Sequence, residues 1–190
     1  MTKKVYGVAY NDVPGSSMQS KAIYTAWYGM LTRCFSEKYR QKYPTYSECT
    51  VAAEWLKYSE FYDWAVWQHH DGMHLDKDIL VPGNKHYSPD TCVFIPHWLN
   101  SFVSNMKKKP RDLPMGVHRS RNKFGARFGC RGTGVFIGSF ATAEEAGAAY
   151  MAYRAPEIAK RIQTYKESEY SDSRVVSALL DLFLADECAG

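Results

Sequence analysis

The segment from Gly116 to Tyr153 restricts the fold of this 190-residue chain more than any other part of the sequence. It reads GVHRSRNKFGARFGCRGTGVFIGSFATAEEAGAAYMAY, and apolar and polar residues alternate in it around turn-forming stretches at 122–123 and 132–134. A period of two is typical of half-buried strands, so the segment predicts three short antiparallel strands. The alternating apolar positions are Phe124, Ala126, Phe128, Val135 and Ile137.

Helices should follow this sheet and cover one of its faces. Thr142 and Glu145 have the spacing of a capping box, in which each side chain accepts a hydrogen bond from the other residue's backbone N–H. We expect Pro156 to open a second helix that runs to about Lys166, because proline is favoured at the first helical position. Residues 175–184 predict a last amphipathic helix. The apolar stripe that faces the sheet consists of Ala146, Ala149, Tyr150 and Tyr153.

Basic charge is concentrated in one part of the chain. Residues 107–131 contain nine Lys and Arg residues and one acidic residue, whereas the whole chain has a net charge of only +4. Such a concentration indicates a surface that binds a polyanion, although a solvated face without a partner is the alternative. We expect the basic side chains to project from the sheet face that the helix leaves open, where arginine can read guanine. The expected DNA contacts are Arg119, Arg121, Lys123, Phe124, Arg127 and Arg131, with Lys107, Lys108 and Lys109 from the preceding linker.

The order of strands, turns and capped helix resembles the AP2 DNA-binding domain, in the short form found in phage and mobile-element nucleases. The matching pieces are Gly116-Val117, Phe124-Gly125-Ala126-Arg127, Gly138-Ser139-Phe140 and Thr142-Ala143-Glu144-Glu145-Ala146, with Ala149-Tyr150. The resemblance implies double-stranded DNA as the partner. It places an AP2-like domain at 114–168, after a basic linker at 107–113 and before a C-terminal helix at 169–190.

The first part of the chain, residues 1–106, predicts a mainly helical module after a strand-like start at 5–10. Helical spacing begins at Lys21, and Ser59 is the expected cap of a second helix. We interpret Trp27, Trp55 and Trp64 as core residues, because tryptophan at helical spacing is typical of a buried face. The apolar face of the first helix carries Ile23, Trp27, Met30, Leu31 and Cys34, and that of the second Phe61, Trp64, Ala65 and Gln68.

Residues 74–100, HLDKDILVPGNKHYSPDTCVFIPHWLN, predict a strand, a polar loop, a second strand that ends at Pro96, and a helix from about His97. With YTAWYGMLTRCF and YSECTVAAEWLKYSEFYDW, they resemble the HNH (His-Me finger) nucleases, which have a ββα-metal fold. The resemblance implies that Asp76 and Asn100 are metal ligands. It also implies that Lys77 stands at the position of the general-base histidine and Thr91 at that of the orienting asparagine.

Lysine is a poor general base, because its ordinary pKa of ~10.4 keeps it protonated. We therefore expect a sequence-selective double-stranded DNA-binding protein of phage or mobile-element type, on a degenerate HNH scaffold that does not cleave. Lys77 would then form ion pairs with Asp76 and Asp78 or contact a phosphate. One alternative is an active homing-type endonuclease that uses Mg²⁺ or Mn²⁺ and His74, which faces the same side of its strand as Asp76. Another is a phage protein that binds a host factor.

The overall expectation is an α+β fold, with the ββα-like module followed by the three-stranded sheet, its packing helix and the C-terminal helices. No apolar run is long enough for a membrane span and no signal-peptide core is present, so we expect a cytoplasmic protein, in a bacterial host cell if phage-encoded. The five cysteines form no CxxC pair and are interpreted as buried hydrophobes, with zinc binding by Cys34, Cys49 and Cys92 as the alternative. The terminal helix, with Val175, Val176, Leu179, Leu180, Leu182 and Phe183, offers a possible homodimer surface, although packing on its own domain is favoured.

Overall fold

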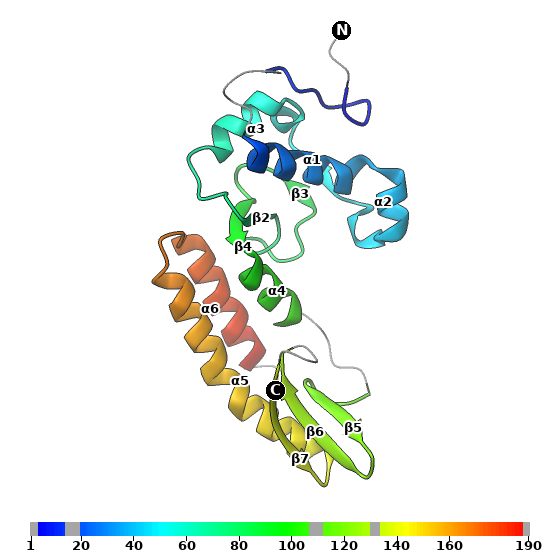
Figure 1. The fold of residues 1–190 in the computed structure, drawn as a ribbon, viewed down its shortest axis with the longest axis vertical. Coiled ribbons are helices and arrows are strands. Elements are labelled where there is room, and N and C mark those ends of the chain that lie inside the picture. The colour runs from blue at the N-terminus through cyan, green and yellow to red at the C-terminus, as the bar shows by residue number, and fades with distance from the viewer. Residues whose placement is uncertain (1–3, 14–19, 107–111, 130–133, 188–190) are drawn as a thin grey trace. The chain divides into compact units, whose positions relative to one another are not determined.

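The computed structural model describes residues 4–13, 20–106, 112–129 and 134–187. They form two units, Met1–Ser101 and Phe102–Gly190, each of which is described by itself. Helices and small sheets occur in both, so the predicted α+β class is confirmed (Figure 1). The division lies inside a helix, a few residues before the boundary predicted after residue 106.

Unit 1 is mainly helical, as predicted. The helix α1 spans Lys21–Phe35, and its N-cap Ser20 accepts a hydrogen bond from the backbone N–H of Ile23. All five residues of its predicted apolar face are buried. The other helical elements are α2 (Glu37–Lys42), η1 (Pro44–Tyr46), η2 (Ala53–Leu56) and α3 (Tyr58–Ala65).

Aromatic side chains fill the core of unit 1. Trp27 and Trp55 are buried, and Trp27 Nε1 donates a 2.7 Å hydrogen bond to the backbone oxygen of Trp55. The ring of Trp55 lies 4.9 Å from that of Phe61 and 4.6 Å from that of Trp64, between centroids. The interpretation of all three tryptophans as core residues is confirmed, because Trp64 packs against the same cluster.

The helix α3 does not begin as the sequence predicted. Its N-cap is Lys57, which forms no side-chain cap, and Ser59 lies inside the helix. The hydroxyl of Ser59 donates to Asp12 Oδ2 at 2.6 Å and its backbone N–H donates to Asp12 Oδ1 at 3.0 Å. The Asp12 carboxylate, distant in sequence, thus caps the start of α3. Gln68, which was predicted to lie on the apolar face of this helix, lies beyond its end at Ala65. The strand-like start also differs, because 5–9 form a tight turn closed by a bridge between Val5 and Ala9.

A strand–loop–strand–helix sequence follows along the chain, in the predicted order. The strands β2 (Met73–Asp76) and β4 (Val93–Pro96) pair antiparallel, and α4 (His97–Met106) begins directly after β4. The second strand ends at Pro96, as predicted. The loop between them contains β3 (His86–Tyr87), which pairs in parallel with β1 (Thr50–Val51).

Unit 2 contains one antiparallel sheet in the order β5-β6-β7. Its strands are β5 (Val117–Ser120), β6 (Lys123–Phe128) and β7 (Val135–Phe140). The helix α5 (Ala143–Lys166) lies against the sheet, and α6 (Ser173–Glu187) packs on α5 (Figure 1). The predicted capping box of Thr142 and Glu145 is present. The first turn is at 121–122, one residue earlier than predicted, and most of the second lies outside the described residues.

Pro156 does not open a helix but lies inside α5, which continues through it for 24 residues in total. Proline has no N–H to donate and disfavours a helix interior by about 3 kcal/mol. The helix nevertheless continues because its second half is packed: Ile158, Ile162 and Tyr165 are buried, as are Val175 and Leu179 of α6. On α6, Leu180 and Leu184 remain exposed.

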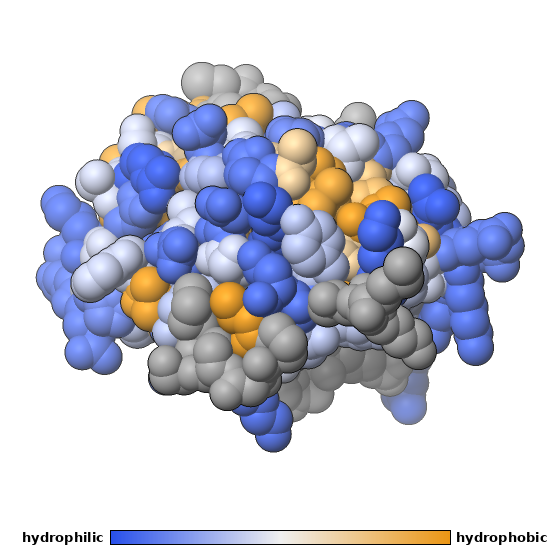
Figure 2. Space-filling model, turned by 90° about the horizontal axis from the view of Figure 1, so that it is seen from above, coloured by the Kyte–Doolittle hydropathy of each residue, from blue (hydrophilic) through white to orange (hydrophobic). Residues whose placement is uncertain are grey.

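The surface is predominantly polar on the side seen in Figure 2, where apolar residues appear in scattered patches. None of the helices in the described part of the chain has both the length and the apolar character that crossing a membrane requires.

Candidate functional site

The pairing of the strands in unit 2 determines which side chains share a face. Ala126 is fully buried on the side of α5, and the ring of Phe128 lies 5.7 Å from that of Tyr153. Because side chains alternate along a strand and directly paired residues lie on the same side, the residues between them point away from α5. We call this side the outer face, and it carries His118, Ser120, Lys123, Gly125, Arg127, Phe136 and Ser139.

Arg127 and Phe136 form a pair at one end of the outer face. The Arg127 guanidinium carbon lies 5.8 Å from the centre of the Phe136 ring, and its Nη1 donates to the backbone oxygen of Gly134 at 2.7 Å. The two residues are directly paired across the strands, beside an irregularity that leaves Ile137 outside the ladder. Phe136 is nevertheless 53% exposed. The large apolar ring of Phe136 is therefore exposed to solvent beside the Arg127 guanidinium, which is hydrogen-bonded to the backbone.

His118 lies flat on the middle strand of the outer face. A Cβ atom at Gly125 would come within 2.6 Å of the imidazole, so glycine permits this close approach. Beside it, a hollow of about 610 Å³ opens along β5. Its lining is Gly116, Val117, His118, Arg119, Ser120, Arg127 and Gly129.

The prediction that the basic side chains share a single face is wrong for Arg119. Arg119 pairs directly with Phe124, on the α5 side of the sheet, and its guanidinium carbon lies 5.2 Å from the Phe124 ring centre. Successive side chains of β5 point to opposite sides of the sheet, so Arg119 lies on the same side as the partly buried Val117, two residues before it. Arg121 occupies the turn with a φ of 53°. The other predicted contacts, Lys107, Lys108, Lys109 and Arg131, lie outside the described residues.

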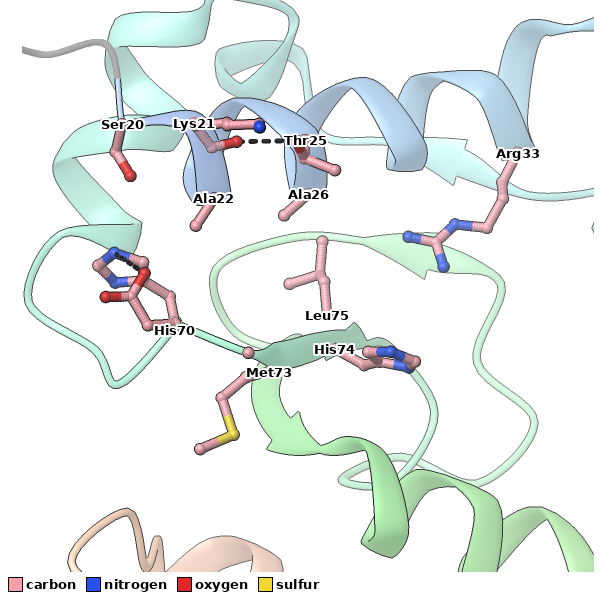
Figure 3. A pocket seen from close by; sticks show the side chains of 12 residues that line it. Ser20, Lys21, Ala22, Thr25, Ala26, Arg33, His70, Met73, His74 and Leu75 are labelled. Atoms are coloured by element: carbon pink, nitrogen blue, oxygen red, sulfur yellow. Dashed lines mark hydrogen bonds and ion pairs between the residues drawn. The ribbon is translucent and has the colours of Figure 1, made fainter.

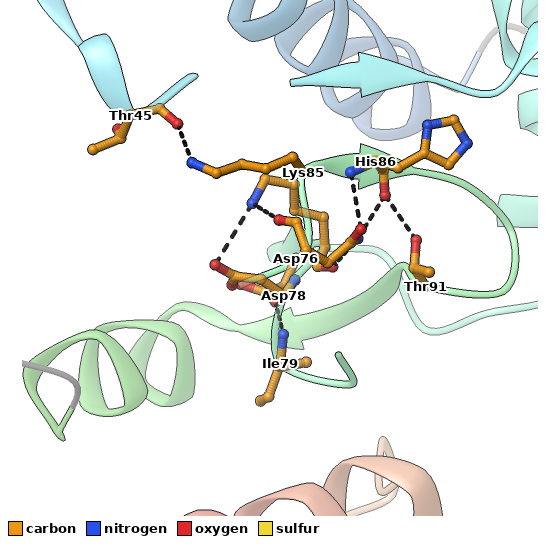
Figure 4. Close-up of polar contacts among 9 residues, drawn as sticks. Thr45, Asp76, Asp78, Ile79, Lys85, His86 and Thr91 are labelled. Carbon is orange, nitrogen blue, oxygen red and sulfur yellow. Dashed lines mark hydrogen bonds and ion pairs between the residues drawn. The ribbon is translucent and has the colours of Figure 1, made fainter. Parts of the chain in front are cut away.

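In unit 1, Asp76 is used to hold the loop that follows β2. Its Oδ1 accepts hydrogen bonds from the backbone N–H groups of Asp78 at 2.9 Å and Ile79 at 2.7 Å (Figure 4). Such a carboxylate turn stabilises the start of a loop. Its oxygen is therefore directed to the protein's own backbone.

Lys77 is almost completely buried, and its amine serves as a structural link. Nζ donates to the backbone oxygen of Asn84 at 2.7 Å and lies 3.6 Å from Asp78 Oδ2, so the predicted ion pair with Asp78 is present. The Asn84 amide returns hydrogen bonds to the backbone oxygens of Lys77 and His86. Two side chains thus join the ends of the loop reciprocally.

Thr91 also closes this loop rather than orienting an imidazole. Its Oγ1 donates to the backbone oxygen of His86 at 2.8 Å (Figure 4). The imidazole of His86 is instead 2.8 Å from Thr50 Oγ1, through Nδ1. The position where the resemblance implied an orienting asparagine therefore has a backbone partner.

The structure brings His74, a predicted catalytic candidate, to Asn100. The amide nitrogen of Asn100 lies 3.3 Å from His74 Nδ1, and the His97 ring lies 4.7 Å from the His74 ring. Partial burial, His97 and Arg33 together lower the pKa of His74, which favours its neutral imidazole. Figure 3 shows Arg33 extending from α1 towards the strand that carries His74, at a hollow of about 740 Å³.

Mg²⁺ and Mn²⁺ require several oxygen ligands. Of the two residues implied as ligands, Asp76 accepts two backbone N–H groups through Oδ1, and Asn100 directs its amide nitrogen to His74. No group of three or more His, Cys, Asp or Glu residues in the described ranges could hold a metal ion.

The three cysteines proposed as zinc ligands are buried in unit 1. Burial raises the pKa of the Cys34 and Cys92 thiols to about 12. The burial of all three side chains suits the interpretation as small hydrophobes.

Sequence reasoning missed several residues of both sites. His97, Arg33 and Asn84 are brought to the loop or to His74 by contacts between distant elements, for which the sequence has no local signal. His118 and Phe136 lie in the predicted strands, and the strand register would have placed them on the outer face.

Comparison of the chain with protein-family models, with curated proteins and with solved structures finds no match.

Proposed function

We propose that the chain binds double-stranded DNA through the outer face of unit 2 and does not cleave it. The observation that carries the proposal is the charge of this face: it has Lys123, Arg127 and His118, while β5, β6 and β7 contain no Asp or Glu. A face with cations and no carboxylates attracts a polyanion. Its hydroxyl groups, on Ser120 and Ser139, are suitable donors to phosphate oxygens.

The shape of unit 2 favours a duplex as the polyanion. A small sheet with a helix on one side only has an open, twisted face, and two- or three-stranded elements of this kind enter a major groove. Arg127 is then positioned to donate to guanine, while Lys123 on the outer face and Arg121 in the turn at 121–122 contact phosphates.

The test is the affinity of the double variant Lys123→Ala/Arg127→Ala for duplex DNA at several salt concentrations. Loss of both cations should weaken binding by about 10- to 100-fold and lower the dependence of log K on log salt by about two units. The matched control is Lys160→Ala/Lys166→Ala, which removes the same charge from exposed positions of α5. Equal losses in the two double variants would show that net charge, and not the outer face, determines binding.

We also expect that restoring the missing histidine does not create a nuclease. In Lys77→His, the imidazole replaces the loop-closing amine while the carboxylate of Asp76 remains bound to the loop backbone. Supercoiled DNA should stay intact with Mg²⁺ or Mn²⁺, for this variant and for the unaltered protein. Losing the buried hydrogen bond to Asn84 should lower the free energy of unfolding by about 1–3 kcal/mol. Metal-dependent nicking by the unaltered protein that disappears in Asp76→Ala would instead establish the active-endonuclease alternative.

A further inference from the structure

We propose that Phe136 contacts the C5-methyl group of thymine in the major groove, so that the outer face distinguishes pyrimidines with a C5-methyl group from those without one. This inference rests on the proposed binding of duplex DNA, and it adds the chemical group that the face recognises.

Phe136 is an exposed apolar side chain on a polar face. About half of this ring is open to solvent, although it lies among cationic and hydroxyl side chains on a face that α5 does not cover. Leaving apolar surface in water forgoes hydrophobic stabilisation, which an apolar ligand group would recover on binding.

The Phe136 ring has a cation against it. Arg127 lies over Phe136 and is itself tied to the backbone oxygen of Gly134. The irregularity in β7 next to this pair leaves Ile137 out of the ladder, and bulges of this kind are found where a strand re-aims a side chain. A ligand at this end of the sheet therefore meets an apolar ring and a cation together.

Only one group on the base edges of a duplex is apolar and projects into the major groove, namely the thymine C5-methyl. Phosphates flank it on both strands, and these suit the cations beside Phe136. Single-stranded nucleic acid is a weaker fit, because its binding platforms stack successive bases on several aromatic rings. On the described outer face, Phe136 is the exposed aromatic ring.

The experiment compares duplexes that differ only in the methyl group. The probes are a 24-base-pair alternating A·T duplex and the same duplex with uracil in place of thymine. The protein should bind the thymine duplex about 3- to 10-fold more tightly, given the hydrophobic gain from burying a methyl group on each contact. Conversely, an alternating G·C duplex that contains 5-methylcytosine should bind more tightly, by a similar factor, than the same duplex with unmodified cytosine.

Phe136→Ala should bind both duplexes of each pair equally. Val135→Ala is the matched control, since Val135 is also exposed but pairs with Phe128 on the other side of the sheet, and it should keep the preference. Both positions are surface positions, and the far-ultraviolet circular dichroism of both variants should match that of the unaltered protein.

Equal binding of thymine and uracil duplexes by the unaltered protein would overturn the methyl contact while leaving duplex binding in place. Tighter binding of single-stranded d(T)24 than of the duplex would overturn it in favour of base stacking. Failure to bind any duplex would remove the proposed function itself, and the inference with it.

Discussion

Replacing Trp27 by alanine should lower the free energy of unfolding of unit 1 by about 3–5 kcal/mol. The side chain is fully buried, its ring lies 5.3 Å from that of Tyr58, and its Nε1 donates to the backbone oxygen of Trp55. Alanine would leave a large cavity and a buried carbonyl without its donor, and both effects destabilise the folded state. A loss of this size is a substantial part of the stability of a small domain.

The matched control is Trp67→Ala, because Trp67 is 90% exposed and its loss should change stability by no more than about 0.5 kcal/mol. Hydrogen exchange resolved by peptide provides the measurement. Amides of α1 and α3 should lose protection in Trp27→Ala, whereas those of β6 should keep it, because β6 belongs to unit 2. Loss of DNA affinity in Trp27→Ala at a temperature where β6 remains protected would show that unit 1 takes part in binding.

Replacing Gly116 by alanine should destabilise unit 2 by about 3 kcal/mol or more and abolish DNA binding at temperatures where the sheet opens. Gly116 has a φ of +74°, in the region where residues with a Cβ atom are strained, and the added Cβ would lie 2.1 Å from the Tyr150 ring. Tyr150 is itself buried against the sheet, so the ring cannot move aside without opening the contact between β5 and α5.

Gly83→Ala separates the two causes, because Gly83 has a similar φ of +79° with no atom near the added Cβ. It should cost about 1–2 kcal/mol, from backbone strain alone. The double variant Gly116→Ala/Tyr150→Ala should be less destabilised than the sum of the single variants, since removing the ring removes the clash. Thermal unfolding and hydrogen exchange of β5 and β6 measure both effects. Strict additivity would contradict the steric explanation.

Patterns within one element predicted well. The spacing of Ile23, Trp27 and Met30 predicted the buried face of α1, and Thr142 with Glu145 predicted the start of α5. In these cases the signal and the structure it specifies lie within a few residues of each other. Pro156 misled for the opposite reason, because packing of the residues after it outweighs the local preference of proline to begin a helix.

Side-chain roles in the candidate sites were harder to predict. The sequence identified the strand that ends at Asp76, but the use of Asp76 and Lys77 in closing a loop depends on Asn84 and on the path of the chain between β2 and β4. Of the predicted basic face, the strand register places Lys123 and Arg127 on the outer face and Arg119 on the other side of the sheet, because the parity of β5 is set by which residue the helix buries.

The carboxylate that caps α3 has a consequence for how the chain folds. Asp12 lies 47 residues before Ser59, and the same N-terminal segment exchanges backbone hydrogen bonds between Tyr10 and residues 56 and 58. The first turn of α3 is therefore completed by a long-range closure, whose entropic cost must be met before the contact contributes. Nucleation at α1, whose cap Ser20 is local, should precede the ordering of α3. The contacts of the N-terminal segment with α3 would then couple the folding of α3 to that of the rest of unit 1.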